Sequence, residues 1–468
     1  MACRNYVEPC PNCPRAFRAI GGDGPQPARI LCIAERPGRI ENNFGRVLCG
    51  DTGQEYDGLY LPLAGLDRAV VRACNTVLCW AMDNRTPDDK EIQHCAQHHL
   101  PAEIRETDPE IIILMGSSAC SLVPGIKLEM MHGIPQHTNK VGDLFGWSGW
   151  LIPMYHPSLG MHESRWMKIL MDDWQGLQRI LADADANGCQ PDPLAKPTDY
   201  RWCRTRAEVD GYFVQHYVSS SETGVDTESH GDRLWSIQAS CAPQTGILVR
   251  TTDQDALDAL RFWIDGCWMH NAQYDMEELR RIGLRPCVLG DTMQRAFHLG
   301  DQPQGLKSLV YRLFRHTMTS YEETVRPASI RALQDWYCEA LAVAQSDLSF
   351  VETVKMKTKT KTVVHKGEFE KLLTRLMRHT DTAADYDPWE RLDAFWSDPL
   401  TEWMIPVIES RVGPYPILGI GNCDMPTAIR YAVGDADWTG QVAAELARRR
   451  EGVFSINEND RDEFRYNN

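Results

Sequence analysis

Two acidic residues, Asp226 and Glu228, close a short apolar segment in the sequence "TGVDTESHG". Side chains alternate between the two faces of a β-strand, so Thr227 points away and both acids leave the same face. Two carboxylates on one face make half of a divalent-metal site when further acids are brought beside them. Alone, such a pair is most often part of a turn or a helix cap.

Two later segments place a polar residue four positions before an acid. Asn271 and Asp275 lie in "HNAQYDMEELRRIG", whose helical pattern ends at Gly283, and Tyr431 and Asp435 lie in "RYAVGDAD". Residues four apart on a helix share a face, so each pair is predicted to project in one direction. An exposed helix face is the ordinary alternative for either pair alone.

If these segments pack together, four carboxylates share one pocket, and their mutual repulsion requires neutralising cations. Hard oxygen ligands favour Mg²⁺ or Mn²⁺. Two such ions, roughly 3.5–4 Å apart, stabilise the attacking and leaving oxygens when a phosphodiester is hydrolysed. Tyr431, one turn before Asp435, is expected to orient the attacking water.

A second group of residues is formed by cysteines in the first hundred positions. Cys10 and Cys13 form a C-x2-C pair, and Cys79 and Cys95 follow later. The pair alone fits a redox site, half of a zinc site or two buried thiols. Four thiolates fit zinc and a [4Fe–4S] cluster equally well by ligand number.

The segments around these cysteines alternate between strand-like and helical patterns. Strands are predicted over Ala28–Glu35, Pro109–Gly116 and Trp150–Ser158, and a helix over Arg165–Ala186. Such alternation indicates an α/β domain with a parallel sheet over residues 1–186.

A stretch rich in Gly and Pro at 187–199 is predicted to be a linker. The region 200–468 follows, with a meander of strands "TGVDTES", "LWSIQASC" and "TGILVR" and then helices, which suits a mixed-sheet α/β fold. Its last helix is expected to start at Asp424 as the cap, with Pro426 in the first turn.

An irregular stretch at about 317–423 looks like an insertion into this second domain. It contains the basic run "KMKTKTKTVVHK", Lys355–Lys366, which is most typical of a solvated loop or hairpin and less often of a contact to a DNA backbone.

Composition bounds the class of protein. The 468 residues are 43% hydrophobic and 24% charged, and no apolar run approaches the ~18 residues of a membrane span. The first residues lack the features of a secretory signal, so we expect a cytoplasmic protein whose 16 cysteines are not disulfides. The net charge of −16 argues against coating nucleic acid by bulk attraction, but not against local DNA binding.

The ordered segments "DTE", "HNAQYD" and "YAVGDAD" resemble the three motifs of the DEDDy 3′–5′ exonucleases, above all the proofreading domain of family A DNA polymerases. The segments "DTM" at Asp291 and "GLKSL", which contains Lys307, resemble others of that family. The resemblance implies an RNase H-like fold, two Mg²⁺ or Mn²⁺ ions, and contacts from Asn271 and Lys307 to the substrate.

The first region resembles the family 4 uracil-DNA glycosylases, through "IAERPGRIENNFGRVLCGDTG", "NTVLCWAMDNRTPDDKEIQHC" and "YHPSL". This implies a three-layer α/β/α domain with a [4Fe–4S] cluster on Cys10, Cys13, Cys79 and Cys95. The other cysteines, Cys3 included, are expected to be buried or incidental residues.

The same resemblance implies roles for four pocket residues. Asn75 reads the uracil edge through its amide, His156 donates to the oxygen on which charge develops, and Glu35 positions or activates water. The family's usual "GEAPG" is "AERPG" here, which introduces Arg36, and Leu48 stands where an aromatic ring stacks on the base. Loss of that stacking, worth ~1–3 kcal/mol per base, predicts weaker base capture.

The two resemblances together predict a DNA-processing protein of the replication or repair machinery. A glycosylase-like domain before such an exonuclease resembles the front of some bacteriophage polymerases, and the chain ends at Asn468 without a polymerase. We therefore expect a separate family A-type polymerase as partner, in the host cytoplasm if the protein is phage-encoded. The alternatives are a replisome scaffold whose first domain is a non-catalytic clamp, and an RNA-trimming enzyme.

Overall fold

The structure is a computed structural model of the chain. It describes residues 5–8, 18–82, 84–187, 197–217, 223–301, 303–346, 349–355, 360–366, 406, 409–410 and 412–454. Cys10 and Cys13, residues 188–196 of the predicted linker 187–199 and much of the predicted insertion lie outside the described residues.

By their contacts the residues form two compact units. The first contains Met1–Ala195 and Met293–Thr317, and the second contains Lys196–Thr292 and Met318–Asn468. The domain prediction placed all of 200–468 together, whereas the structure groups Met293–Thr317 with the first unit. A physical reason is visible in that segment, because Arg312 extends a guanidinium 2.8 Å from the buried carboxylate of Asp173.

The first unit is built on a five-stranded sheet in the order β4-β3-β5-β7-β6. Its elements run β1 (Tyr6–Val7), β2 (Ala19–Ile20), β3 (Ile30–Ala34), α1 (Arg39–Phe44), α2 (Asp51–Glu55), η1 (Tyr56–Tyr60), α3 (Leu61–Leu63), β4 (Val71–Asn75), α4 (Asp89–Thr107), β5 (Ile111–Met115), α5 (Ser117–Cys120), α6 (Leu128–Met131), β6 (Gln136–His137), α7 (Thr138–Val141), β7 (Trp150–Met154), α8 (Ser158–His162), η2 (Ser164–Trp166), α9 (Met167–Asn187), α13 (Thr292–His298) and α14 (Leu306–Phe314).

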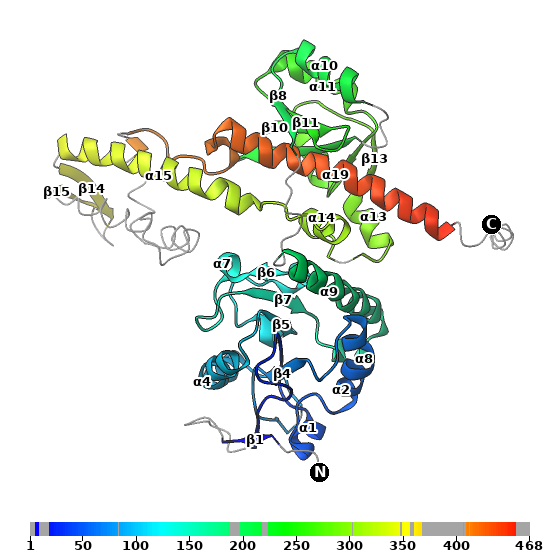
Figure 1. The fold of residues 1–468 in the computed structure, drawn as a ribbon. Coiled ribbons are helices and arrows are strands. Elements are labelled where there is room, and N and C mark those ends of the chain that lie inside the picture. The colour runs from blue at the N-terminus through cyan, green and yellow to red at the C-terminus, as the bar shows by residue number, and fades with distance from the viewer. Residues whose placement is uncertain are drawn as a thin grey trace. The chain divides into compact units, whose positions relative to one another are not determined.

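Helices cover both faces of this sheet, with α9 on one side and α4 on the other (Figure 1). The strands β3, β5 and β7 are almost wholly buried because both faces are covered, which is why they read as continuous apolar runs. The predicted parallel α/β domain is confirmed in its layers, while β6 adds an antiparallel edge and β4 is a strand that the sequence analysis did not identify.

The second unit holds a six-stranded mixed sheet in the order β13-β12-β9-β10-β11-β8. Its elements are β8 (Asp199–Trp202), α10 (Arg206–His216), β9 (Gly224–His230), β10 (Arg233–Ser240), β11 (Thr245–Arg250), α11 (Gln254–Trp263), β12 (Cys267–Met269), α12 (Ala272–Arg281), β13 (Val288–Asp291), α15 (Tyr321–Ser346), β14 (Ser349–Lys355), β15 (Thr360–Lys366), η4 (Ile420–Asn422) and α19 (Met425–Phe454).

The predicted meander is confirmed, because β9, β10 and β11 pair antiparallel in sequence order. The long helix α19 lies across these strands, and α10 and α11 pack on the opposite face (Figure 1). At Gly224 the sheet and α19 approach closely, since a Cβ there would lie 2.1 Å from the carbonyl oxygen of Ala436. The described residues of the basic run lie at the end of β14 and in β15, and these strands pair antiparallel, which agrees with a hairpin, one of the two predicted forms.

No helix among the described residues is long and apolar enough to cross a membrane.

Candidate functional sites

The parallel strands of the first unit end in a cluster of polar residues. Glu35 follows β3, Asn75 ends β4, Ser118 follows β5 and His156 follows β7. In chain order these strands stand as 2-1-3-4, so the order reverses between β3 and β5. Ligands of open α/β sheets bind at the carboxyl ends of the strands beside such a reversal.

Direct contacts tie the strand ends together. The Ser118 hydroxyl donates a 2.8 Å hydrogen bond to one carboxylate oxygen of Glu35, across the reversal point. Gly116, with φ +92, lies against His156, because a Cβ at Gly116 would be 3.2 Å from that of His156. No sequence motif pointed to Ser118, although its place just after a buried strand is a signal for such a role.

Asn75 is 2% exposed, and its Nδ2 has no hydrogen-bond acceptor among the described residues. Leaving a buried amide unpaired costs about 1–3 kcal/mol, so this donor is suited to a ligand that supplies an acceptor. Asn75 alternates in register with Val71 and Ala73, so its side chain leaves the sheet on the face covered by α9.

His156 is a neutral imidazole in this pocket, because burial lowers its pKa to about 4. Its Nδ1 lies 3.3 Å from the backbone N–H of Ser158, which donates to it, and 2.8 Å from the Ser158 hydroxyl. Since Nδ1 accepts, the proton of the neutral ring is on Nε2. The residue therefore presents a single N–H donor.

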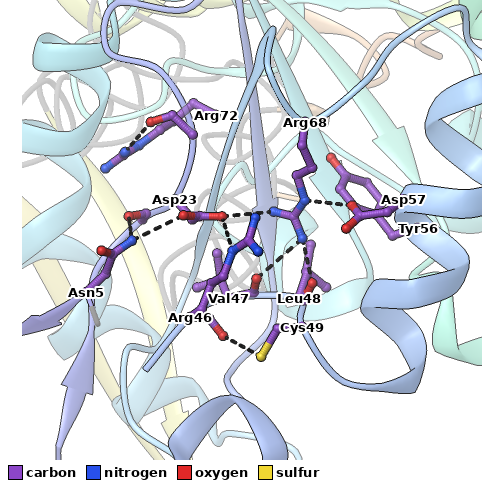
Figure 2. Close-up of polar contacts among 12 residues, drawn as sticks. Asn5, Asp23, Arg46, Val47, Leu48, Cys49, Tyr56, Asp57, Arg68 and Arg72 are labelled. Carbon is purple, nitrogen blue, oxygen red and sulfur yellow. Dashed lines mark hydrogen bonds and ion pairs between the residues drawn. The ribbon is translucent and has the colours of Figure 1, made fainter. Parts of the chain in front are cut away.

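Leu48, the predicted stacking position, lies in a loop held by an arginine network that the sequence analysis missed. The Leu48 carbonyl accepts a 2.5 Å hydrogen bond from Arg68, and Leu48 itself has φ +47 and is 7% exposed. Figure 2 shows Arg68 between Asp57, at 2.6 Å, and Asp23, at 3.7 Å. The guanidinium also lies over the Tyr56 ring, 5.1 Å from its centre.

Cys79 and Cys95 lie in one small apolar cluster, 5% and 6% exposed. The Leu78 backbone N–H donates to the Cys95 sulfur at 3.3 Å. Cys10 and Cys13 lie outside the described residues, but the strands on either side of that segment, β1 and β2, pair with each other, and Ala19 of β2 bridges to Cys79. The described half of the predicted ligand set therefore fits a thiolate-bound metal group.

In the second unit, Asp226, Glu228 and Asp435 converge. Each offers one carboxylate oxygen such that all three oxygens lie within 4.8 Å of one another. Asp226 and Glu228 come from β9, and Asp435 comes from α19, which packs on that strand. Three oxygen ligands at this spacing fit a hard divalent cation.

Asp275, the fourth predicted acid, is 3% exposed and is not among the three acids whose oxygens converge, so the predicted group of four is found only in part. It lies beside Thr227 instead. The Thr227 hydroxyl donates a 2.6 Å hydrogen bond to Asp275. Burial raises the pKa of this carboxyl to about 7, with the nearby charge of Asp291 acting in the same direction. Thr227, to which no motif assigned a role, joins Asp275 to the strand that carries Asp226 and Glu228.

Asn271 does not share a helix face with Asp275, and that prediction is wrong. Asn271 precedes α12 in a left-handed conformation, with φ +63, and its backbone N–H donates to Asp291 at 3.1 Å. Asp291 also accepts from the Ala272 N–H at 2.9 Å. The Asp291 carboxylate thus accepts from the backbone at the start of α12, and Asn271 is the residue before the helix.

Tyr431 and Asp435 lie one turn apart on α19, as predicted. Burial, followed by the charges of Asp435, Glu228 and Asp226, raises the pKa of Tyr431 far above its usual value, and its hydroxyl donates to Asp435. It is therefore a protonated donor at the acid cluster. The predicted cap is confirmed, because Asp424 accepts from the Thr427 N–H at 2.8 Å.

A second tyrosine, Tyr321, borders this site and was missed by the sequence analysis. Its ring packs edge-on against Tyr431, with ring centres 5.8 Å apart. Burial and the charge of Glu228 raise the pKa of Tyr321. Because Tyr321 lies within the predicted insertion, no motif pointed to it.

Lys307 lies on α14, which groups with the first unit. The next residue, Ser308, donates a 2.8 Å hydrogen bond to the Met130 carbonyl of that unit. The predicted contact of Lys307 with a substrate of the acid cluster therefore stays a prediction.

Comparison with known proteins connects residues 22–174 with the uracil DNA glycosylase superfamily. The type-4 uracil-DNA glycosylase of Thermotoga maritima is 31% identical over 175 residues, which cover 36% of this chain and 86% of that protein. DNA polymerase I of Aquifex aeolicus is 29% identical over 134 residues, which cover 28% of this chain and 22% of the polymerase. The solved EXD2 exonuclease domain is 17% identical, with a TM-score of 0.17 over 32% of this chain and 94% of that domain.

Proposed function

The chain belongs, through its N-terminal region, to the uracil-DNA glycosylase superfamily, and on that premise we propose that it is a DNA-processing enzyme with two active sites. The first excises uracil from DNA. The second is a metal-dependent 3′–5′ exonuclease.

The observation that carries the first activity is the buried, unpaired Nδ2 of Asn75. In a uracil flipped out of the helix, O4 accepts and N3–H donates, which matches the amide of asparagine. Cytosine presents the opposite pattern at these positions, so it would leave the buried amide unpaired. The site therefore discriminates by hydrogen bonding.

His156 and Glu35 complete the proposed reaction. The bond between the sugar C1′ and uracil N1 breaks, and the Nε2–H of His156 donates to the uracil oxygen that gains charge. Glu35, held by Ser118 through one carboxylate oxygen, positions the water that attacks C1′. The products are free uracil and an abasic site.

Cys79 and Cys95, with Cys10 and Cys13, are proposed to hold a [4Fe–4S] cluster. In that role the cluster joins the N-terminal segment to α4, which carries Cys95.

The observation that carries the second activity is the convergence of Asp226, Glu228 and Asp435. These residues would hold one Mg²⁺ or Mn²⁺ ion, and Asp275 would add a ligand for a second. The ions supply stabilisation for the attacking and leaving oxygens of the phosphodiester. Tyr431, a protonated donor, orients the attacking water through its oxygen while bonded to Asp435.

The test of the nuclease uses 3′-labelled single-stranded DNA with Mg²⁺. Wild type is expected to shorten it, the Asp226→Ala variant is not, and Asp232→Ala, an exposed acid in the adjacent turn, serves as the matched control. If the wild-type protein leaves the DNA intact, the proposed exonuclease activity is wrong.

Excision is tested with a single-stranded DNA that carries one uracil, followed by alkali. Wild type is expected to yield cleaved product, and Asn75→Ala is expected to yield little. Intact DNA with wild type would instead favour the non-catalytic clamp.

We also propose that the nuclease serves a separate DNA polymerase. The partial similarity to a DNA polymerase I supports this, over 22% of the polymerase. A proofreading role predicts faster removal of a mismatched 3′ end than of a matched one.

A further inference from the structure

Arg36 is a buried cation beside the proposed uracil pocket. It follows Glu35 directly, and its side chain is 4% exposed. A buried guanidinium is tolerated only where its donors are paired. The partners of Arg36 therefore show what it holds.

Three partners of Arg36 among the described residues lie in the segment from Cys79 to Glu91. The Nε and Nη2 atoms of Arg36 donate to the Cys79 carbonyl, at 3.2 and 2.9 Å. Its Nη1 donates to the Arg85 carbonyl at 3.1 Å and lies 3.8 Å from the Glu91 carboxylate.

Glu91 links this segment to the helix that carries Cys95. It forms a capping box with Asp88 at the start of α4, and Cys95 lies one turn further on. Glu91 also pairs with Arg85 at 2.8 Å. One guanidinium thus fixes the backbone at Cys79 and reaches the first turn of the Cys95 helix.

We propose that Arg36 is a positioning residue, and this proposal rests on the proposed cluster. Arg36 holds Cys79 and Cys95 in place for metal binding and connects them to Glu35. A backbone hydrogen bond supports the connection to Glu35, because the Val77 N–H donates to the Glu35 carbonyl at 3.0 Å. Hydrogen bonds therefore connect the backbone of Glu35 to Val77 and the side chain of Arg36 to Cys79.

The charge of Arg36 has a separate consequence. A fixed cation bonded to the backbone of a cluster ligand stabilises the more negative, reduced form of an iron–sulfur cluster. Removing the charge should therefore lower the reduction potential.

The test uses the full chain with its metal group bound, in wild type, Arg36→Met and Arg36→Lys. Arg36→Met is expected to lose iron to a chelator about tenfold faster and to have a lower reduction potential. Arg36→Lys keeps the charge but not the forked donors, so it should lose iron faster with a nearly unchanged potential. Arg29→Met, which removes an arginine from an exposed ion pair, is the matched control.

The outcomes separate this proposal from the proposed function. Equal iron loss in wild type and Arg36→Met would overturn the role of Arg36, whatever the excision activity. A colourless zinc protein would overturn the cluster, and zinc retention would then test Arg36 in the same variants. If Arg36→Met does not fold, Arg36→Lys decides, and wild-type retention in it would overturn the proposal.

Discussion

The two candidate sites treat charge in opposite ways. At the strand ends of the first unit, Asn75 is a buried amide and His156 is a half-buried imidazole that is neutral near pH 7, because desolvation lowers its pKa to about 4. In the second unit, Asp226, Glu228 and Asp435 bring three acids within 4.8 Å. The first site can donate hydrogen bonds to an uncharged group, whereas the second would need cations before it could bind an anion such as a phosphate.

This difference predicts how each site fails. If the proposed functions hold, loss of one donor in the first site should weaken recognition of a base, and loss of one acid in the second should remove a metal ligand. Because the two sites lie in separate units, each variant should affect one activity only.

The largest effect is expected for Asp435→Asn, which should slow shortening of 3′-labelled DNA by ~10³-fold, since a metal ion supplies several kcal/mol of transition-state stabilisation. Uracil excision by the same variant should match wild type. A parallel fall in both activities would mean that the sites are not independent.

The converse variant is His156→Ala. Removing one donor from the developing oxyanion should slow uracil excision by about 10²–10³-fold. Alkali cleavage of uracil-containing DNA measures the rate, His162→Ala on the exposed end of α8 is the control, and nuclease activity should not change. Excision by His156→Ala at the wild-type rate would mean that another residue donates to the uracil oxygen.

A smaller effect concerns pH at Asp275, which is bonded to Thr227 of the strand that carries Asp226 and Glu228. Burial raises the pKa of Asp275 to about 7, so a proton must leave before this carboxylate binds a cation. Mn²⁺ affinity should therefore rise with pH, by about tenfold from pH 6 to pH 8. Calorimetric titration measures this, and Asp275→Asn should show weaker binding without that rise. The same rise in Asp275→Asn would attribute it to another group.

The smallest effect is expected at Tyr321. Its edge-on contact with Tyr431 is worth about 0.5–1.5 kcal/mol, so Tyr321→Leu should slow the nuclease by roughly threefold to tenfold. Tyr321→Phe keeps the ring and should stay close to wild type. If both variants behave alike, the ring contact does not position Tyr431.

Much of this organisation could be predicted from local patterns. The apolar runs of β3, β5 and β7 and the alternation in β9 follow from burial and from the two-residue period of strands. The helical spacing of Tyr431 and Asp435 and the cap at Asp424 are equally local, and the structure agrees with both.

Other features depend on partners far away in the chain. The sequence pattern predicted Asn271 within a helix. In the structure the helix begins after it, and Asp291, 20 residues later in the chain, accepts from the backbone at that point. The segment with Lys307 groups with the first unit because Arg312 meets a buried Asp173, 139 residues earlier. Local sequence patterns cannot predict such pairs, because the partners are far apart in the chain.

By itself the sequence determined that Asp226 and Glu228 share a strand face and that Tyr431 and Asp435 lie one helical turn apart, because these relations depend on the fixed periods of the backbone. Tertiary structure alone decided that three acids meet, that Asp275 accepts a hydrogen bond from Thr227, and that Arg36 donates to the Cys79 carbonyl. The physical reason is burial. Removing a charged or polar group from water makes its few remaining partners decisive, and only the packed chain chooses those partners.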